Sequence, residues 1–160
     1  MEEVNQTLDY LWKKTYQGTD IDSVCIRADS DGTSGGLRAY QYRVCMRKDG
    51  IELDMRGRCS TGQKVLACIL IRLALADSFG GACGCMALDE PTTNLDRENV
   101  EALAASLVDL LAERQHQPNF QLIVITHDEE FLTRLSQSDA LEHYWRVSRD
   151  TCLLYTSPSP

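Results

Sequence analysis

A short apolar stretch that ends in two adjacent carboxylates constrains this chain more than any other feature. Residues Cys85 to Leu88 are typical of a buried strand, Asp89 and Glu90 follow directly, and a polar loop leads on to Asp96. Open α/β sheets bind ligands at the carboxyl ends of their strands. An aspartate at such an end can hold Mg²⁺ directly or through water, which leaves the next glutamate free to orient a water molecule. The stretch therefore predicts a site that handles Mg²⁺ and a reactive water.

Size and composition fit one globular domain without a generally basic surface. The chain has 160 residues, of which 43% are hydrophobic and 25% are charged, and its formal net charge is −8. It has enough apolar residues to bury a core, and any DNA contact must be local. No run approaches the roughly 20 apolar residues of a membrane span, and the first residues do not form a signal peptide. We expect an intracellular, soluble protein with no membrane partner.

The cysteines are expected to be small buried thiols. No C-x₂-C pair occurs, and most of the seven lie within apolar runs, which fits a reducing compartment without disulfides. They are Cys25, Cys45, Cys59, Cys68, Cys83, Cys85 and Cys152. Cys83 and Cys85 could suggest a metal site, but only Gly84 separates them on one face of a strand, so packing is the better interpretation.

Hydrophobic periodicity predicts an α/β fold with a mainly parallel sheet flanked by helices and a small antiparallel β region. Continuous apolar strands that alternate with helices indicate a parallel sheet covered on both faces. The expected elements are an amphipathic helix at 2–16, a strand at 21–29, a turn at 30–36, a half-buried strand at 40–47, a helix at 65–76 that is apolar nearly all round, a strand at 83–88, a helix at 97–114 with Asp96 as its N-cap, a strand at 120–126 and a helix at 128–136. Residues 151–160 read as neither helix nor strand, and we expect a disordered tail.

A second candidate site precedes the apolar helix. Ser60 and Gly62 lie where a helix N-terminus presents unpaired N–H groups to an anion, which makes them phosphate-binding candidates. A simple N-cap is the alternative, and it is favoured when this pattern is considered alone. Gly57 and Gly62 have the glycine spacing of a P-loop, but Gln63 and Lys64 follow instead of Lys-Ser or Lys-Thr. The phosphate-binding P-loop must therefore lie elsewhere.

Two further residues call for an explanation. His127 ends the second apolar strand at the same sheet edge as Asp89 and Glu90, so positioning a phosphate there is favoured over a structural role. Arg72 lies within the apolar helix, where an arginine must pair with a carboxylate or a carbonyl, or extend to solvent. Pairing is the default; a partner near Asp89 would link the Ser60 loop mechanically to the carboxylates.

Four ordered motifs resemble the signature, Walker B, D-loop and H-loop of ABC-type ATPases. They are Ser60-Thr61-Gly62-Gln63, Leu88-Asp89-Glu90-Pro91, Asn94-Leu95-Asp96 and Thr126-His127-Asp128. The longer strings 55–67 and 87–97 resemble the Rad-fifty family, the SMC-like ATPases of the Mre-eleven double-strand-break repair complex, over residues from the first helix to about Arg149. The resemblance implies that the chain is the C-terminal ATPase lobe, with a coiled-coil end at 1–16, the lobe at 17–150 and a tail at 151–160.

The resemblance also implies partners, cofactors and a location. In this family a long coiled coil separates the lobe from an N-terminal lobe that carries Walker A, and a Zn²⁺ hook lies at the apex of the coil, outside this chain. ATP drives two copies together, and the Mre-eleven nuclease binds near the base of the coil. The whole protein would hydrolyse ATP with Mg²⁺, clamp double-stranded DNA and act in the nucleus, whereas this lobe alone would be inactive.

The motif positions imply roles for individual residues. Ser60, Gly62 and Gln63 would contact the γ-phosphate of the partner's ATP, and Asp96 would contact the opposite active site. Asp89 would hold Mg²⁺, Glu90 would polarise the attacking water and His127 would hold the γ-phosphate. Arg72 would couple the nucleotide state to lobe rotation. Thr61 departs from the Gly or Ala of many signatures, and the tail does not resemble the family's C-terminus.

Other interpretations stay open at this point. A local basic cluster is a DNA-binding candidate through Arg43 and Arg47, with a solvated surface as an equally good explanation. The cluster consists of Arg43, Arg47, Lys48, Arg56 and Arg58. The chain could instead come from an ABC transporter or another SMC ATPase, although a transporter domain has its Walker A upstream in the same polypeptide. A non-enzymatic docking lobe is the third possibility, which intact Asp89, Glu90 and His127 argue against.

Overall fold

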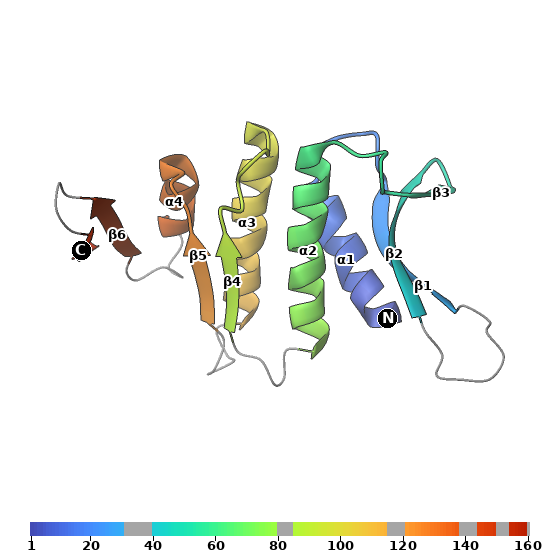
Figure 1. Ribbon diagram of the computed structural model, residues 1–160, viewed down its shortest axis with the longest axis horizontal. Helices are drawn as coiled ribbons and strands as arrows, with labels where there is room; N and C mark the ends of the chain where they lie inside the picture. Colours follow the sequence, from blue (N-terminus) through green and yellow to red (C-terminus); the bar gives the residue numbers. More distant parts are fainter. Residues whose placement is uncertain (31–39, 80–84, 115–120, 138–143, 150–153, 160) are drawn as a thin grey trace.

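The computed structural model describes residues 1–30, 40–79, 85–114, 121–137, 144–149 and 154–159. Along its long axis, Figure 1 shows a small antiparallel sheet at one end, then three helices, then a parallel strand pair with a further helix. The α/β architecture with a parallel pair and a small antiparallel sheet confirms the predicted fold class. The predicted turn at 30–36 lies, apart from Ser30, outside the described residues, as does Cys83.

The antiparallel sheet consists of β1 (Ser23–Ser30), β2 (Tyr40–Lys48) and β3 (Ile51–Asp54), in that order. Asp49 and Gly50 join β2 to β3 with φ values of 49° and 79°, the left-handed pair that a two-residue hairpin turn requires. The strand at 40–47 was predicted to be half-buried along its whole length, which is wrong for its first half. Met46 is buried, whereas Tyr40 and Tyr42 are 50% and 64% exposed because the core ends before them.

Helix α1 (Glu2–Thr15) confirms the predicted amphipathic helix and buries one stripe of side chains against α2, α3 and β1. The stripe consists of Val4, Leu8, Leu11, Trp12 and Thr15. Trp12 is 1% exposed, and its indole N–H donates to the carbonyl of Ile21, 3.1 Å away. The base of α1 is therefore fixed to the start of the antiparallel sheet.

Helix α2 (Thr61–Phe79) begins earlier and ends later than the predicted apolar segment. Leu66, Leu70 and Leu73 are buried in the main core. The prediction that the helix is apolar nearly all round overstated its burial, because Cys68 and Arg72 are exposed four residues apart on one stripe. The helix thus has one solvent-facing side in the described structure.

The parallel sheet pairs β4 (Cys85–Asp89) with β5 (Gln121–Ile125), and Asp89 lies opposite Ile125. Helices α3 (Arg97–Arg114) and α4 (Glu129–Ser136) follow the two strands, as predicted. Only one face is covered: Met86 and Leu88 are buried, while Ile123 and Ile125 are 42% and 55% exposed. The predicted cover on both faces is therefore wrong for the described residues, because no described helix packs on the second face.

The prediction that residues after Arg149 form neither helix nor strand is wrong for six of them. Strand β7 (Leu154–Ser159) pairs antiparallel with β6 (Tyr144–Arg149), a strand that the pattern did not predict. Leu154, Tyr155 and Thr156 favour a strand, and a proline such as Pro158 is tolerated in the edge strand of a two-stranded ribbon. Residues 150–153 and 160 lie outside the described part.

Candidate functional site

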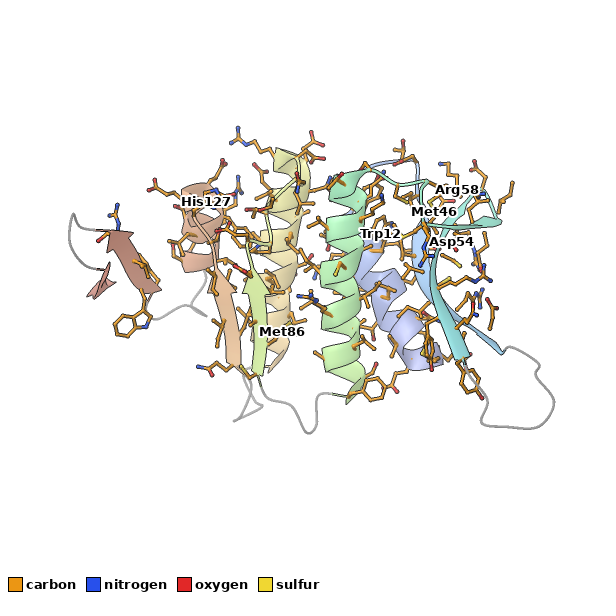
Figure 2. All side chains as sticks on the ribbon, viewed as in Figure 1. Trp12, Met46, Asp54, Arg58, Met86 and His127 are labelled. Carbon is orange, nitrogen blue, oxygen red and sulfur yellow. The ribbon has the colours of Figure 1, made fainter. Side chains whose placement is uncertain are left out.

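The amino end of α2 and the carboxyl ends of β4 and β5 lie at one edge of the molecule, uppermost in Figure 1. The loop from β4 to α3 also returns to this edge, and Figure 2 shows His127 just beyond the end of β5. The fold thus brings all four sequence motifs to one edge. A chain segment of about 70 residues separates Ser60 from His127, so this proximity results from the tertiary fold.

Glu90 has a strained backbone at the end of β4. Its φ is 45°, a left-handed value that non-glycine residues rarely adopt. Its N–H donates to the carbonyl of Ile125 at 2.8 Å, which extends the pairing of the two strands. Asp89, one residue earlier, is exposed at the strand end. Strain of this kind concentrates at functional sites and is maintained by the surrounding structure.

His127 contacts the Glu90 carboxylate. Its Nδ1 lies 2.7 Å from Oε2 of Glu90, an ion-pair distance when the imidazole is protonated. The Glu90 carboxylate raises the pKa of His127 above its ordinary value near 6.5. The imidazole is 85% exposed and the glutamate side chain 35% exposed. The predicted neighbourhood of these two residues is thus present, and solvent reaches the histidine.

Ser60 and Gln63 cap the amino end of α2 reciprocally. The Ser60 Oγ accepts from the N–H of Gln63 at 3.2 Å, and the Gln63 Oε1 accepts from the N–H of Ser60 at 2.9 Å. This arrangement is a capping box. Ser60 is exposed and its hydroxyl accepts rather than donates here, so its proton stays available to an anion in front of the helix. Capping and anion binding are therefore compatible at this serine.

Gly62 lies directly against the backbone of the loop after β4. A Cβ at Gly62 would lie 2.5 Å from the carbonyl oxygen of Asn94, so no larger residue fits without moving the loop. Asn94 has a φ of 64°. Asp96 then caps α3, because its Oδ1 accepts from the N–H of Asn99 at 2.9 Å, and this hydrogen bond lowers the pKa of Asp96. The predicted N-cap is confirmed.

A cleft of about 540 Å³ lies between the amino ends of α2 and α3. Its lining includes Ser60, Gly62 and Gln63 on one side and Asn94, Asp96 and Asn99 on the other. Tyr16 and Gln17, from the turn after α1, complete it. The cleft thus brings together the motif at Ser60 and the motif at Asp96, which lie apart in the sequence. It also includes a turn that the sequence analysis did not single out.

Sequence reasoning missed Tyr16 and Asp20. The Gln63 Nε2 donates to the Tyr16 hydroxyl at 2.8 Å and to Asp20 Oδ2 at 2.7 Å, and Tyr16 donates to Asp20 Oδ1. Partial burial, with Asp20 nearby, raises the pKa of Tyr16 to about 12, and the tyrosine hydrogen bond lowers the pKa of Asp20. The Ser-x-x-Gln spacing could have revealed the capping box. No local signal connects Asp20 to a residue 43 positions away.

The edge suits a nucleotide and Mg²⁺ only in part. Asp89 supplies one exposed carboxylate, and Mg²⁺ is typically bound by one or two carboxylates plus phosphates and waters. Within the described ranges, no group of three or more His, Cys, Asp or Glu residues could hold a metal ion alone. Asp89 could therefore serve as one ligand of Mg²⁺ only where phosphates and waters supply the others.

The remaining candidates lie away from this edge or are already paired. Arg72 is exposed and has no ion pair with the described residues, so neither the default pairing nor a link to Asp89 is present in this part of the chain. Arg43 pairs with Asp29 at 2.6 Å, and Arg47 contacts Glu52 at 3.4 Å. Glu52 also binds Arg27 at 2.6 Å, which lowers the pKa of Glu52 to about 2. Arg43 and Arg47 therefore belong to a network of exposed ion pairs.

The described cysteines and helices bear on two kinds of site considered from the sequence, metal or disulfide sites and membrane spans. The prediction of buried thiols is wrong for Cys68 and Cys85, which are exposed, whereas Cys45 is buried and Cys25 and Cys59 are partly buried; none of these five described cysteines is in a disulfide. Among the helices that the structure describes, none combines the length and the apolar composition needed to cross a bilayer.

Comparison with known proteins shows strong sequence similarity to one group. The chain is 62% identical over 152 residues to the DNA repair protein rad50 of Schizosaccharomyces pombe and 56% identical over 150 residues to RAD50 of Saccharomyces cerevisiae. Each alignment covers 94% of this chain, which spans only 12% and 11% of the length of these relatives. No protein-family model matches.

Solved structures show the same fold. The Smc head domain of Pyrococcus furiosus, solved with an extended coiled coil and bound to the C-terminal domain of ScpA, superposes with a TM-score of 0.67. The match covers 99% of this chain and 35% of that one at 18% identity. An identity this low shows the fold alone.

Proposed function

Because the chain is homologous to a segment of the Rad50 DNA repair proteins and has the fold of an SMC head domain, we propose that it is the C-terminal ATPase lobe of a double-strand-break repair ATPase. The whole protein would dimerise on ATP, clamp DNA and regulate a partner nuclease. Homology to DNA repair proteins supports the general role, and the features of the site support the finer steps.

One observation carries this proposal: the described chain gathers at one edge the groups that half of an ATP site would need. A capped helix end with exposed Ser60, a strand-end Asp89, a strained Glu90 and a solvent-accessible His127 lie there together. The sequence contains no G-x₄-G-K-[ST] segment to bind the phosphates of ATP from the other side. This absence supports a composite site, whose other half would come from an N-terminal lobe with a Walker A segment.

Each residue has a role that its position supports. Ser60 can donate its hydroxyl proton to a γ-phosphate in front of α2, where the N–H groups of the first turn also point. Gly62 lets the helix end approach the loop around Asn94 closely. Asp96, at the rim of the same cleft, would contact the opposite active site. These three residues form the surface that closes on a nucleotide held by the second copy.

The residues at the carboxyl ends of β4 and β5 would activate the attacking water. Asp89 would hold Mg²⁺, which neutralises charge on the phosphates when it is bound. Glu90 would orient and polarise the attacking water, because its carboxylate is half-buried and fixed by the strained backbone. His127 contacts that carboxylate and would also reach the γ-phosphate. The rate gain would come from positioning and electrostatics.

The open face of the parallel sheet supports an N-terminal lobe as partner. Parallel sheets are normally covered on both faces, but Ile123 and Ile125 expose an apolar surface beside Ala87, which is also exposed. The edges of the two-stranded sheet are also available for further strands. A lobe that packs here would bring its phosphate-binding loop to the edge with Asp89.

The remaining partners rest on homology. Helix α1 would be the end of the coiled coil, whose apical hook would hold Zn²⁺ outside this chain, and the Mre-eleven nuclease would bind near the base of that coil. Double-stranded DNA would contact Arg43 and Arg47 after they exchange carboxylates for phosphates. Arg72 would couple nucleotide state to lobe rotation. The protein would act on chromosomes in the nucleus.

Assembly with a separately expressed N-terminal lobe tests the proposal. Gel filtration with light scattering should show a one-to-one complex that ATP converts into a dimer of complexes. Glu90→Gln should make that dimer persist, because ATP then binds without being hydrolysed. A chain that never binds the Walker A lobe would favour the non-enzymatic docking lobe. The transporter alternative is weaker, because the relatives at 56% and 62% identity are DNA repair proteins.

A further inference from the structure

The turn after α1 contacts both motifs that border the cleft. This turn, residues 16–20, follows the last residue of α1 directly. On one side, Tyr16 and Asp20 accept hydrogen bonds from the Gln63 carboxamide. On the other side, the N–H of Gln17 donates to Oδ1 of Asn99 at 3.2 Å. Five residues thus connect the end of one helix to the amino ends of two others.

The Gln63 carboxamide is held on three sides. Its two N–H donors go to Tyr16 and Asp20, and its oxygen accepts from the N–H of Ser60. A carboxamide has two donors and one oxygen acceptor, so little capacity remains for a phosphate. Gln63 is therefore better suited to orient Ser60 than to bind the nucleotide itself.

The turn is anchored to the core at its own start. The Tyr16 ring stacks on Trp12 with 4.5 Å between the centroids, and Trp12 is buried and bonded to Ile21. Gly18 leaves room for the Tyr16 side chain, because a Cβ there would overlap the end of the tyrosine ring. Movement of α1 would therefore be passed to the Tyr16 hydroxyl through packed groups.

The connection to α3 starts from the same turn after α1. Asn99 is buried, and its Nδ2 donates to Oδ2 of Asp96 at 2.7 Å while its N–H is capped by the same carboxylate. The N–H of Gln17 thus reaches the loop before α3 through Asn99. The capping box at Ser60 and the loop at Asp96 would both close on the second copy's nucleotide. Each is connected to this one short turn by hydrogen bonds.

We propose that Tyr16 and Asp20 are positioning residues that hold Gln63, and through it Ser60, in the geometry that closes on the nucleotide of the second copy. The inference rests on the proposed function and adds residues outside the four motifs. Tyr16 and Asp20 do not touch the nucleotide; they act through the capping box. The position of helix α1 thereby determines whether Ser60 has the geometry that contacts the nucleotide.

Tyr16→Phe is the main test, because it removes one hydroxyl and keeps the ring that stacks on Trp12. In the chain assembled with the Walker A lobe, we expect the ATP concentration for half-maximal turnover to rise about tenfold, since fewer lobes are binding-competent. The maximal rate should stay within about twofold, because Glu90 and His127 are unchanged. Asp20→Asn should have the same effect. Tyr10→Phe, an exposed tyrosine on α1, is the matched control and should change neither value.

A second measurement separates this inference from the proposed function. In the chain alone, amide hydrogen exchange over residues 60–64 should become faster in Tyr16→Phe and not in Tyr10→Phe. A double variant with Gln63→Ala should be no worse in ATP half-saturation than Gln63→Ala alone, because both changes remove the same connection.

The outcomes are distinct. Faster exchange with an unchanged ATP requirement would overturn the positioning role, as would unchanged exchange. A fall in maximal rate with unchanged half-saturation would also overturn it, because it would place Tyr16 in the chemical step. Faster exchange in an assembly that never turns over ATP, even without substitutions, would contradict the proposed function and leave the connection to Gln63 supported.

Discussion

Gly62 and Asn94 touch across the cleft: a Cβ on the glycine would lie 2.5 Å from the asparagine carbonyl oxygen. This contact ties the amino end of α2 to the loop that leads to α3. Because the neighbour is backbone, it cannot rotate away as a side chain would. The amino end of α2 therefore cannot move closer to this loop without displacing it.

Gly62→Ala should disconnect the amino end of α2 from this loop. We expect a loss of about 1–3 kcal/mol in the free energy of unfolding, typical of overpacking, and at least a tenfold fall in ATP turnover of the assembled lobes. Urea unfolding and a turnover assay measure the two effects. Gly50→Ala is the control: it has a left-handed φ of 79° and open space around it, so it should cost about 1 kcal/mol and leave turnover intact. Equal turnover in both variants would contradict the coupling.

The contact between His127 and Glu90 predicts a pH dependence with a defined sign. A raised histidine pKa means that the folded state binds the proton more tightly than the unfolded state. The stabilisation is then complete below the ordinary value near 6.5 and is lost as pH rises through the raised pKa. Proton NMR should show the His127 pKa falling toward 6.5 in Glu90→Gln. Urea unfolding at several pH values should show a lower free energy of unfolding for Glu90→Gln than for the unsubstituted chain only at acidic pH.

Much of the fold was predictable because its signals are local. The amphipathic stripe from Val4 to Trp12, the apolar runs before Asp89 and His127, and the cap at Asp96 each lie within one short segment. The order of elements from α1 to α4, apart from β3, followed from these signals. The position of the candidate site at one sheet edge then followed from the rule for parallel strands.

The errors have physical causes that lie outside a local pattern. Tyr40 and Tyr42 alternate correctly with polar residues, but the core ends before it reaches them. The runs around Ile123 are as apolar as those of a sheet covered on both faces, although the described chain covers one. The hydrogen bonds of Gln63 to Tyr16 and Asp20 join residues more than 40 positions apart, and side-chain identity alone does not predict such pairs.

The open sheet face predicts a selective binding defect. Ile123→Lys adds a charge to a surface residue that is 42% exposed, so the stability of the chain alone should change by less than about 0.5 kcal/mol. Affinity for the Walker A lobe, measured by calorimetry, should fall at least tenfold because the lysine would be buried without a partner. Val147→Lys, at a 63% exposed valine on β6, should bind normally. Normal binding by Ile123→Lys would place the lobe elsewhere.

DNA binding through the antiparallel sheet can be tested by charge. In the assembled protein, Arg43→Glu with Arg47→Glu should weaken DNA binding and reduce the slope of log affinity against log salt by about 2, one for each lost phosphate contact. Fluorescence anisotropy at several salt concentrations measures both. Lys13→Glu with Lys14→Glu, which also reverses two ion-paired cations, is the control. An unchanged slope in the arginine variant would show that these residues only form the surface ion pairs seen here.

The most direct test of a composite ATP site is turnover by this chain with and without a separately expressed Walker A lobe. Each component alone should be inactive, the mixture should hydrolyse ATP, and Ser60→Arg should abolish that activity by filling the space in front of α2. Hydrolysis by the chain alone, or full activity of the Ser60→Arg mixture, would contradict a site completed by the Ser60 loop.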